Sequence, residues 1–164
     1  MAKLSAEELK KLPKYKSSVV AEAGKDTLLY IDKGGEAGTP TWVVAGGQRN
    51  SPVQYKANEI DASHKTSGGW DDKVAGTRSW TIDYTGLYIM GDEAVQILDH
   101  AFRNSLAVHV KVQYPDESYQ VGWASVTEFS REFPHDNVAT LKVTLNGKGP
   151  ISEIVAKGEQ PKEV

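Results

Sequence analysis

The pattern of apolar and polar positions along the chain is mostly that of β-strands. From Leu106 to Tyr114 almost every second residue is apolar, and a period of two predicts a strand with one buried face. Similar patterns predict further strands over residues 27–32, 41–45, 77–84, 119–133 and 139–145, and an extended segment over 51–63. In this last segment the apolar parity changes at Asn58 and Glu59, which is typical of a β-bulge or a corner.

One helix is well specified within this β-rich pattern. Apolar residues recur at helical spacing over residues 94–102, and Asp92 stands where an N-cap is expected. Residues 64–76 are polar, contain glycine and lack a period, so they predict the longest loop inside the body of the protein. The glycines of residues 147–150 are expected to end the last long strand. About seven strands and one helix predict a mainly β fold, a β-sandwich or open barrel flanked by one α-helix.

The length of 164 residues suits one domain between two extended arms. We expect an N-terminal arm over residues 1–24, a β-sandwich domain over 25–156 and a polar C-terminal tail over 157–164. Pro13 limits any helix in the first arm to one or two turns.

The net charge of −3 is unevenly distributed. Residues 1–16 carry a local charge of +3, so the other 148 residues carry −6. A body of this sign does not attract nucleic-acid phosphates, which bind through lysine and arginine, so DNA binding is not expected to be the main function. No apolar run approaches the roughly 18 to 20 residues of a membrane span, and the N-terminal residues do not resemble a secretory signal.

No group of residues indicates catalysis. Cysteine is absent, which excludes thiol chemistry and disulfides and fits a reducing cytoplasm. The four histidines lack the paired spacing of a zinc site, and the glycine pairs lack a phosphate-binding motif. The sequence therefore predicts a protein that is not an enzyme and has no metal or cofactor.

Trp70 stands out because it lies among polar residues of the predicted loop. Large exposed aromatics are enriched at protein contacts. An equally good interpretation is that Trp70 folds back as a lid over the core. The pattern leaves both interpretations open.

A series of segments in a particular order carries a family resemblance over about residues 26–150. The series consists of residues 46–49, 59–63, 64–70, 76–83 and 86–88, the helix, and residues 108–114, 136–140 and 143–149. The order of these segments and their residues resemble those of the major tail protein, or tail-tube subunit, family of long-tailed bacteriophages.

The resemblance implies a structural virion protein that self-assembles into rings, hexameric in this family, stacked into the tail tube. Phage DNA would pass through the channel during ejection without specific binding, and no membrane would be involved. Implied partners besides the chain itself are the tape-measure, tail-terminator and distal-tail proteins. Its implied location is the virion tail, after assembly in the host bacterial cytoplasm.

Two sets of site residues follow from combining the resemblance with the pattern. Contacts between subunits or rings are expected at Lys65, Trp70, Asp71, Asp72 and Lys73 of the loop and at Tyr15 of the arm. The acids expected to face the channel are Glu59, Asp61 and Asp83.

The alternative is a monomeric β-sandwich module that binds carbohydrate or protein through Trp70, Trp42 or Tyr88. It accounts for the aromatics and the missing catalytic motifs equally well. It accounts less well for the basic arm, the polar tail and the series of family-like segments.

Overall fold

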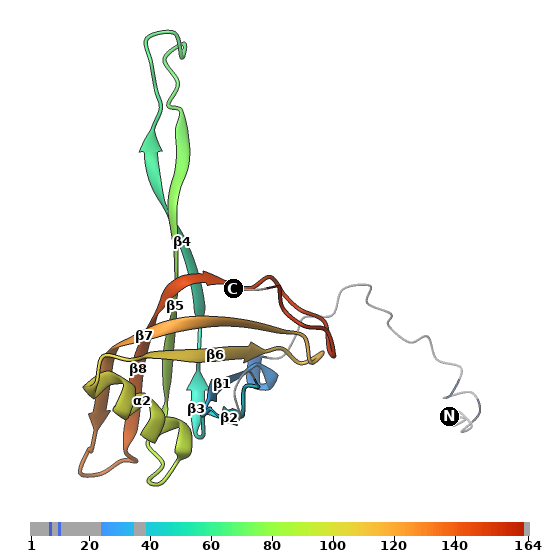
Figure 1. Ribbon diagram of the computed structural model, residues 1–164, viewed down its shortest axis with the longest axis vertical. Helices are drawn as coiled ribbons and strands as arrows, with labels where there is room; N and C mark the ends of the chain where they lie inside the picture. The colour runs from blue at the N-terminus through green and yellow to red at the C-terminus, as the bar shows by residue number, and fades with distance from the viewer. Residues whose placement is uncertain (1–6, 8–9, 11–23, 35–38, 163–164) are drawn as a thin grey trace, which may run out of the picture.

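The computed structural model describes residues 7, 10, 24–34 and 39–162, and within them eight antiparallel strands form one curled sheet (Figure 1). The strands are β1 (Leu28–Asp32), β2 (Trp42–Val44), β3 (Gln48–Asn50), β4 (Val53–Asp61), β5 (Lys73–Leu87), β6 (Ala107–Gln113), β7 (Tyr119–Glu132) and β8 (Thr140–Ile151). Their order is β2-β1-β6-β7-β8-β5-β3, and β4 also pairs with β5. The short 3-10 helix η1 (Gly24–Asp26) precedes β1, and α2 (Glu93–Arg103) follows β5. The mainly β fold with a packed helix is confirmed, as an open half-barrel.

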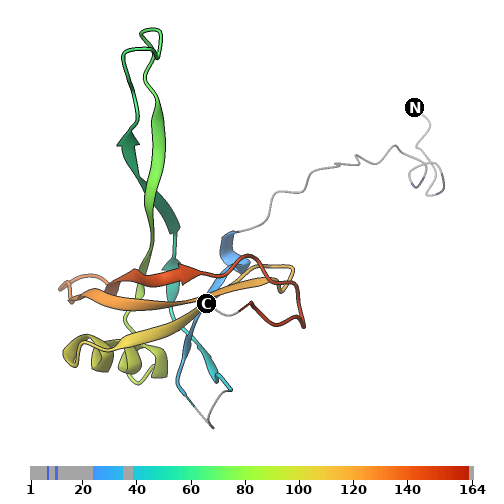
Figure 2. The same cartoon turned by 45° about the horizontal axis from the view of Figure 1, so that its top comes forward.

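The core lies on the concave face of the sheet, where α2 covers it (Figure 2). The alternation predicted for β5 and β6 is confirmed, because one face of each strand is buried. These buried residues are Trp80, Ile82 and Tyr84 of β5 and Val108, Val110 and Val112 of β6. The helix contributes Ala94, Val95, Leu98 and Ala101 to the same core.

Asp92 fixes the start of α2, as the sequence predicts. Its Oδ1 accepts a hydrogen bond from the Val95 N–H at 3.1 Å, which satisfies a free donor of the first helical turn. Its Oδ2 accepts a second bond from the Gly46 N–H at 3.1 Å. One carboxylate therefore caps the helix and holds it against the turn between β2 and β3.

The expectation of a long loop inside the body over residues 64–76 is wrong. Residues 73–76 belong to β5 and pair with β4, so the connection spans only residues 62–72. This connection forms the tip of a β4–β5 hairpin that projects far from the body (Figure 1). Gly76 interrupts the strand pattern in the sequence, and a Cβ added here would lie 3.0 Å from Ile60 Cδ1, so that the Ile60 side chain would have to shift slightly. The predicted bulge is confirmed by a shift of register between Ala57 and Glu59.

The expectation that residues 147–150 end the last strand is also wrong. The indole of Trp80 lies where a Cβ on Gly147 would be, at 2.3 Å, and its Nε1–H donates to the Gly149 oxygen at 2.9 Å. The glycines thus make room for the ring, and pairing between β7 and β8 resumes with Gly122 opposite Ile151. What looks like a strand terminator is an irregularity that admits a core side chain.

Strand β3 was not predicted, because three residues are too few to show a period. Its position depends on close backbone packing, since a Cβ on Gly86 would lie 2.4 Å from the Gly47 oxygen. The Gln48 side chain adds hydrogen bonds of its own, of which the two shortest are one accepted from the Leu29 N–H at 2.9 Å and one donated to the Ala45 oxygen at 2.8 Å.

The structure describes little of the predicted N-terminal arm and most of the predicted C-terminal tail. Nearly all of the arm over residues 1–24, including Tyr15, lies outside the described residues. Residues 157–162 of the C-terminal tail follow an isolated bridge between Tyr119 and Val155. The Tyr119 hydroxyl donates to the Glu159 oxygen at 2.6 Å, which holds the start of this tail against the body.

The contact between Trp80 and Gly147 yields a stability prediction. Gly147→Ala places a methyl group in the volume of the indole, and overpacking of this kind costs about 1–3 kcal/mol. Chemical denaturation should show this loss, while Gly24→Ala, which meets no atom within 4 Å, should be close to neutral. Equal stabilities of the two variants would contradict the packing described for Trp80.

Candidate functional site

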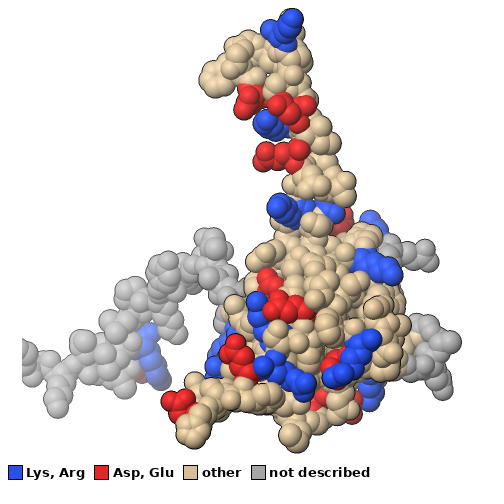
Figure 3. Space-filling view, turned by 90° about the vertical axis from the view of Figure 1, so that its left-hand side faces the viewer, with Lys and Arg blue, Asp and Glu red and all other residues tan. Residues whose placement is uncertain are grey.

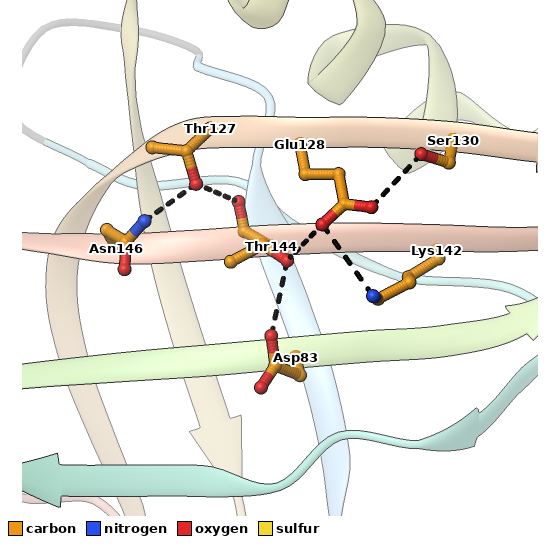
Figure 4. A network of polar contacts seen from close by, with 7 residues as sticks. All are labelled: Asp83, Thr127, Glu128, Ser130, Lys142, Thr144 and Asn146. Carbon is orange, nitrogen blue, oxygen red and sulfur yellow. Dashed lines mark hydrogen bonds and ion pairs between the residues drawn. The ribbon is translucent and has the colours of Figure 1, made fainter.

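The convex face of β5, β8 and the second half of β7 is lined by polar side chains (Figure 4). Residues that alternate with the buried positions project from this face, and a bulge between Val126 and Glu128 adds Thr127 to them. They are Thr81, Asp83 and Thr85 of β5, Lys142, Thr144 and Asn146 of β8, and Thr127, Glu128, Ser130 and Glu132 of β7. We call this set the polar face.

Hydrogen bonds connect the three strands across the polar face (Figure 4). The Thr144 hydroxyl lies 3.2 Å from Asp83 Oδ1 and 3.3 Å from Glu128 Oε2, and its single hydrogen can serve one carboxylate at a time. Lys142 Nζ lies 3.7 Å from Glu128 Oε2, and the Ser130 hydroxyl donates to Glu128 Oε1 at 3.2 Å. These contacts hold the side chains of the polar face in place, and the surface that they form is polar.

The three acids predicted to face a channel neither share one face of the β4–β5 ribbon nor touch. Glu59 lies opposite Ala75 and Asp61 opposite Lys73, and the extra residue of β5 at the bulge between Ala75 and Arg78 puts both pairs on the side of Trp80, opposite to Asp83. Residues directly opposite each other in a sheet project to the same side. Glu59 and Asp61 lie on the projecting part of the hairpin, whereas Asp83 belongs to the polar face of the body.

Asp61 is held near the hairpin tip by local contacts. Its Oδ1 accepts from the Ser63 N–H at 2.9 Å, and Lys73 Nζ lies 3.3 Å from Oδ2. Hydrogen bonds from Ser63, followed by the contact with Lys73, lower the pKa of this carboxyl below its ordinary value. Asp61 therefore carries its charge at neutral pH.

The hairpin tip presents Trp70 to solvent on an ordered turn. The Ser67 N–H donates to the His64 oxygen at 2.9 Å, and the Trp70 N–H to the Ser67 oxygen at 3.2 Å. Gly68 and Gly69, at φ of 67° and 82°, supply the left-handed backbone that this turn requires. Trp70 is 82% exposed, so the interpretation of this residue as a lid over the core is wrong.

The tip brings together most of the predicted contact residues. Lys65, Asp71 and Asp72 are exposed beside Trp70, and Lys73 pairs with Asp61. Figure 3 shows charged side chains of both signs on the projecting hairpin.

Sequence reasoning missed an apolar pair on the stem of the hairpin. Ile60 and Val74 lie opposite each other and are 54% and 50% exposed. Because β5 carries an extra residue at the bulge between Ala75 and Arg78, Val74 projects to the side of Asp83, so the apolar pair continues the polar face of the body and not its core face. The change of apolar parity between Ala57 and Ile60 in the sequence was the signal that could have revealed this.

A groove of about 820 Å³ lies on the convex face near the start of β7. The His109 ring lies between Trp42 and Trp123, with 4.8 Å from its centroid to each of theirs, and its Nδ1 is 3.3 Å from Asp32 Oδ2. Lys111 Nζ lies over the Tyr30 ring at 4.5 Å, and burial lowers the pKa of this amine.

The aromatics of the binding-module alternative do not converge on one site. Trp70 is at the hairpin tip, Trp42 packs against His109, and Tyr88 packs edge-on against Phe133 at 5.8 Å. In the described part of the chain, no three histidine or acidic side chains gather as metal ligands. None of its helices has the length and apolar character needed to cross a membrane.

The sequence itself decides the family. A family model described as phage tail tube protein matches residues 21–153, which is most of the chain. The chain belongs to the phage tail tube protein family. This tail tube protein is accordingly a structural protein of a bacteriophage virion.

Solved structures share the fold of this tail tube protein. The tail of an empty gene transfer agent particle, refined with C6 symmetry, is 23% identical, with a TM-score of 0.72 over 83% of this chain and 100% of the other. The SPP1 tail tube is 14% identical, with a TM-score of 0.66 over 79% and 77% of the two chains. The anti-feeding prophage baseplate structure is 9% identical, with a TM-score of 0.63 over 88% of this chain and 100% of the other. No curated protein matches the sequence.

The exposure of Trp70 predicts how the isolated tail tube protein responds to its loss. Trp70→Ala should change the free energy of unfolding by no more than about 0.5 kcal/mol, as is usual for surface substitutions. Thermal or denaturant unfolding of the monomer measures this. A clear loss of stability would mean that Trp70 packs against the body of its own chain.

Proposed function

We propose that this tail tube protein self-assembles into stacked rings that enclose the channel for DNA ejection, and that its role is structural and not catalytic. The observation that carries the proposal is the β4–β5 hairpin, which exposes Trp70, Ile60 and Val74 on an ordered stem away from the body. Apolar side chains gathered on an exposed element mark a site of protein contact. A second copy of the chain is the partner that a tube requires.

Free sheet edges support ring formation. In the described part of the chain, β2 ends the sheet on one side, and β3 and β4 pair only with β5 on the other. Backbone groups on such edges can bond to the sheet of a neighbour. A contact between two different edges is heterologous, and it closes into a ring when the rotation allows. The C6 symmetry of the related gene transfer agent tail supports six subunits in each ring.

We propose that the polar face, with Asp83, lines the channel; Glu59 and Asp61 project from the other side of the ribbon, and their place at the channel stays a prediction from the sequence. Asp83, Glu128 and Glu132 place three carboxylates on this face, and the cationic side chains of Lys142 and Arg49 lie beside them, which leaves a small excess of negative charge. A lumen with excess negative charge repels phosphate, so DNA passes without binding. The hydrogen bonds around Thr144 hold the acids in place on a rigid sheet.

Other elements of the proposal rest on the sequence and on the family. Lys65, Asp71, Asp72 and Lys73 would surround Trp70 in the contact between rings, and the basic arm over residues 1–24, with Tyr15, would add a second contact. Tape-measure, tail-terminator and distal-tail proteins would be the other partners. Assembly would take place in the host cytoplasm, before the tube becomes part of the virion.

The role of the tip in assembly is tested by Trp70→Ala. Loss of the indole should strongly reduce the length and yield of tubes seen by negative-stain electron microscopy, although the monomer stays folded. The matched control is Ile154→Ala, which removes an exposed apolar side chain outside the hairpin and should leave assembly intact. Deletion of residues 2–16 tests the arm in the same way. Normal tubes from both the Trp70 variant and the deletion would overturn these contacts.

Charge reversal tests the channel assignment. Asp83→Lys and Glu128→Lys add positive charge to the polar face, so DNA should leave phage particles more slowly, and more so at low salt. Ejection kinetics from assembled virions provide the measurement. Glu153→Lys, an exposed acid outside this face, should eject normally. Unchanged ejection in the first two variants would contradict the assignment.

A further inference from the structure

The groove near the start of β7 contains a row of aromatic rings. Trp42, His109 and Trp123 come from β2, β6 and β7, and neighbouring ring centroids in the row are 4.8 Å apart. The rings of His109 and Trp123 are nearly parallel, with 14° between their planes. Trp123 is 45% exposed, so the row ends in an indole that a ligand can reach. We call these three rings the aromatic row.

Asp32 holds the aromatic row in position. Its Oδ2 lies 3.3 Å from His109 Nδ1. Its Oδ1 accepts hydrogen bonds from the N–H groups of Gly34 and Thr41, at 2.8 and 3.0 Å. Because Thr41 directly precedes Trp42, one carboxylate fixes both the imidazole and the backbone beside the first indole. A site that is ordered before its ligand arrives binds at a lower entropic cost.

Lys111 places a positive charge beside the aromatic row. Its Nζ lies 4.5, 5.1 and 5.7 Å from the ring centres of Tyr30, Trp42 and Tyr119, within the range of cation–π contacts. Burial removes water from this ammonium group and lowers its pKa. None of the ion pairs among the described residues includes Lys111. The groove thus holds a partly desolvated cation that no carboxylate of the described chain neutralises.

We propose that this groove binds a carbohydrate that carries an acidic group, with a sugar ring against the aromatic row and the acid beside Lys111. A sugar ring presents a face of C–H groups, which packs on an aromatic face, and a rim of hydroxyls, which need hydrogen-bond partners when they leave water. Gln160 and His109 line the groove as well and supply such partners. The groove volume of about 820 Å³ is that of an ordinary small-ligand site.

Two other ligand classes fit the groove less well. A wholly apolar ligand would cover Lys111 without neutralising it, and burying an unpaired charge is costly. A single strand of nucleic acid would stack its bases on the aromatic row, but its phosphates need a continuous basic surface. The carboxylate of Asp32 beside His109 works against such a surface. One acidic group, by contrast, needs only one cation.

The groove uses neither the polar face nor the β4–β5 hairpin. The polar face occupies β5, β8 and the second half of β7. The groove is formed by β2, β6 and the first half of β7, together with residues 160–162. The hairpin tip projects far from these strands (Figure 1). Carbohydrate binding is therefore a property additional to the proposed tube, and the two can be tested separately.

An array of neutral and acidic bacterial polysaccharides, probed with the purified full-length protein, tests the proposal. Acidic glycans should bind, and calorimetric titration with the strongest of them gives its Kd. Trp123→Ala removes the exposed stacking ring and should weaken binding about tenfold. Lys111→Met removes the charge but keeps an unbranched side chain, so the preference for acidic over neutral glycans should disappear. The matched control is Trp70→Ala, which removes an exposed indole outside the groove and should bind glycan normally.

Three results would overturn the proposal. The first is that no acidic glycan on the array binds, or that Trp123→Ala and Lys111→Met bind as the unchanged protein does. The second is that a thymidine oligonucleotide binds in place of glycans, which would assign the groove to single-stranded nucleic acid. The third is that folded Trp123→Ala fails to form tubes, which would assign the groove to a contact between subunits.

The same variants separate this proposal from the proposed function. Trp123→Ala should form tubes and lose glycan binding, whereas Trp70→Ala should lose tubes and keep glycan binding. Lys111→Met decides the question of the groove if Trp123→Ala does not fold. Absence of tubes from the unchanged protein would contradict the proposed function and leave the glycan result standing.

Discussion

The position of Trp80 in the sheet is the constraint on which the rest of the structure depends. Its indole occupies space that side chains on Gly122 and Gly147 would fill, and it bonds to the Gly149 oxygen. Strand β5 is thereby joined to β7 and β8 near the point where it leaves the body. Residues 80–87 of the same strand pack in the core, and residues 73–79 form the hairpin stem with β4. A rigid anchor at this point lets a two-stranded ribbon project into solvent in a defined direction.

The bulge between Ala57 and Glu59 then gives the two faces of the ribbon different characters. The face of Asp83 continues outward to Val74 and Ile60, which are apolar and half-exposed. The face of Trp80 continues across the bulge to Glu59 and Asp61, and there it is polar. Burying two half-exposed aliphatic side chains contributes only about 1–3 kcal/mol for each copy. In the proposed tube, repetition of such a weak contact around a ring would stabilise the stack through multivalency.

Local features were predictable from the sequence. The alternation of β6, the Asp92 cap and the bulge near Asn58 each depend on a few neighbouring residues, and all three are confirmed. The errors arose where distant segments decide the structure. Gly76 looked like part of a loop because the Ile60 side chain that lies over it comes from another strand. Gly147 looked like a terminator because the ring it admits belongs to β5. The tip residues were found through Trp70, whereas Ile60 and Val74 look like ordinary core positions until the hairpin is seen to leave the body.

The central claim is that the β4–β5 hairpin joins the rings of the tube and that the polar face of the body lines the channel. A helical cryo-electron microscopy reconstruction of tubes assembled from this chain tests it most directly. The account predicts that the β4–β5 hairpin is buried between successive rings and that Asp83 and Glu128 point toward the tube axis. A map in which the hairpin stands free in solvent, or in which the groove around His109 faces the axis, would contradict it.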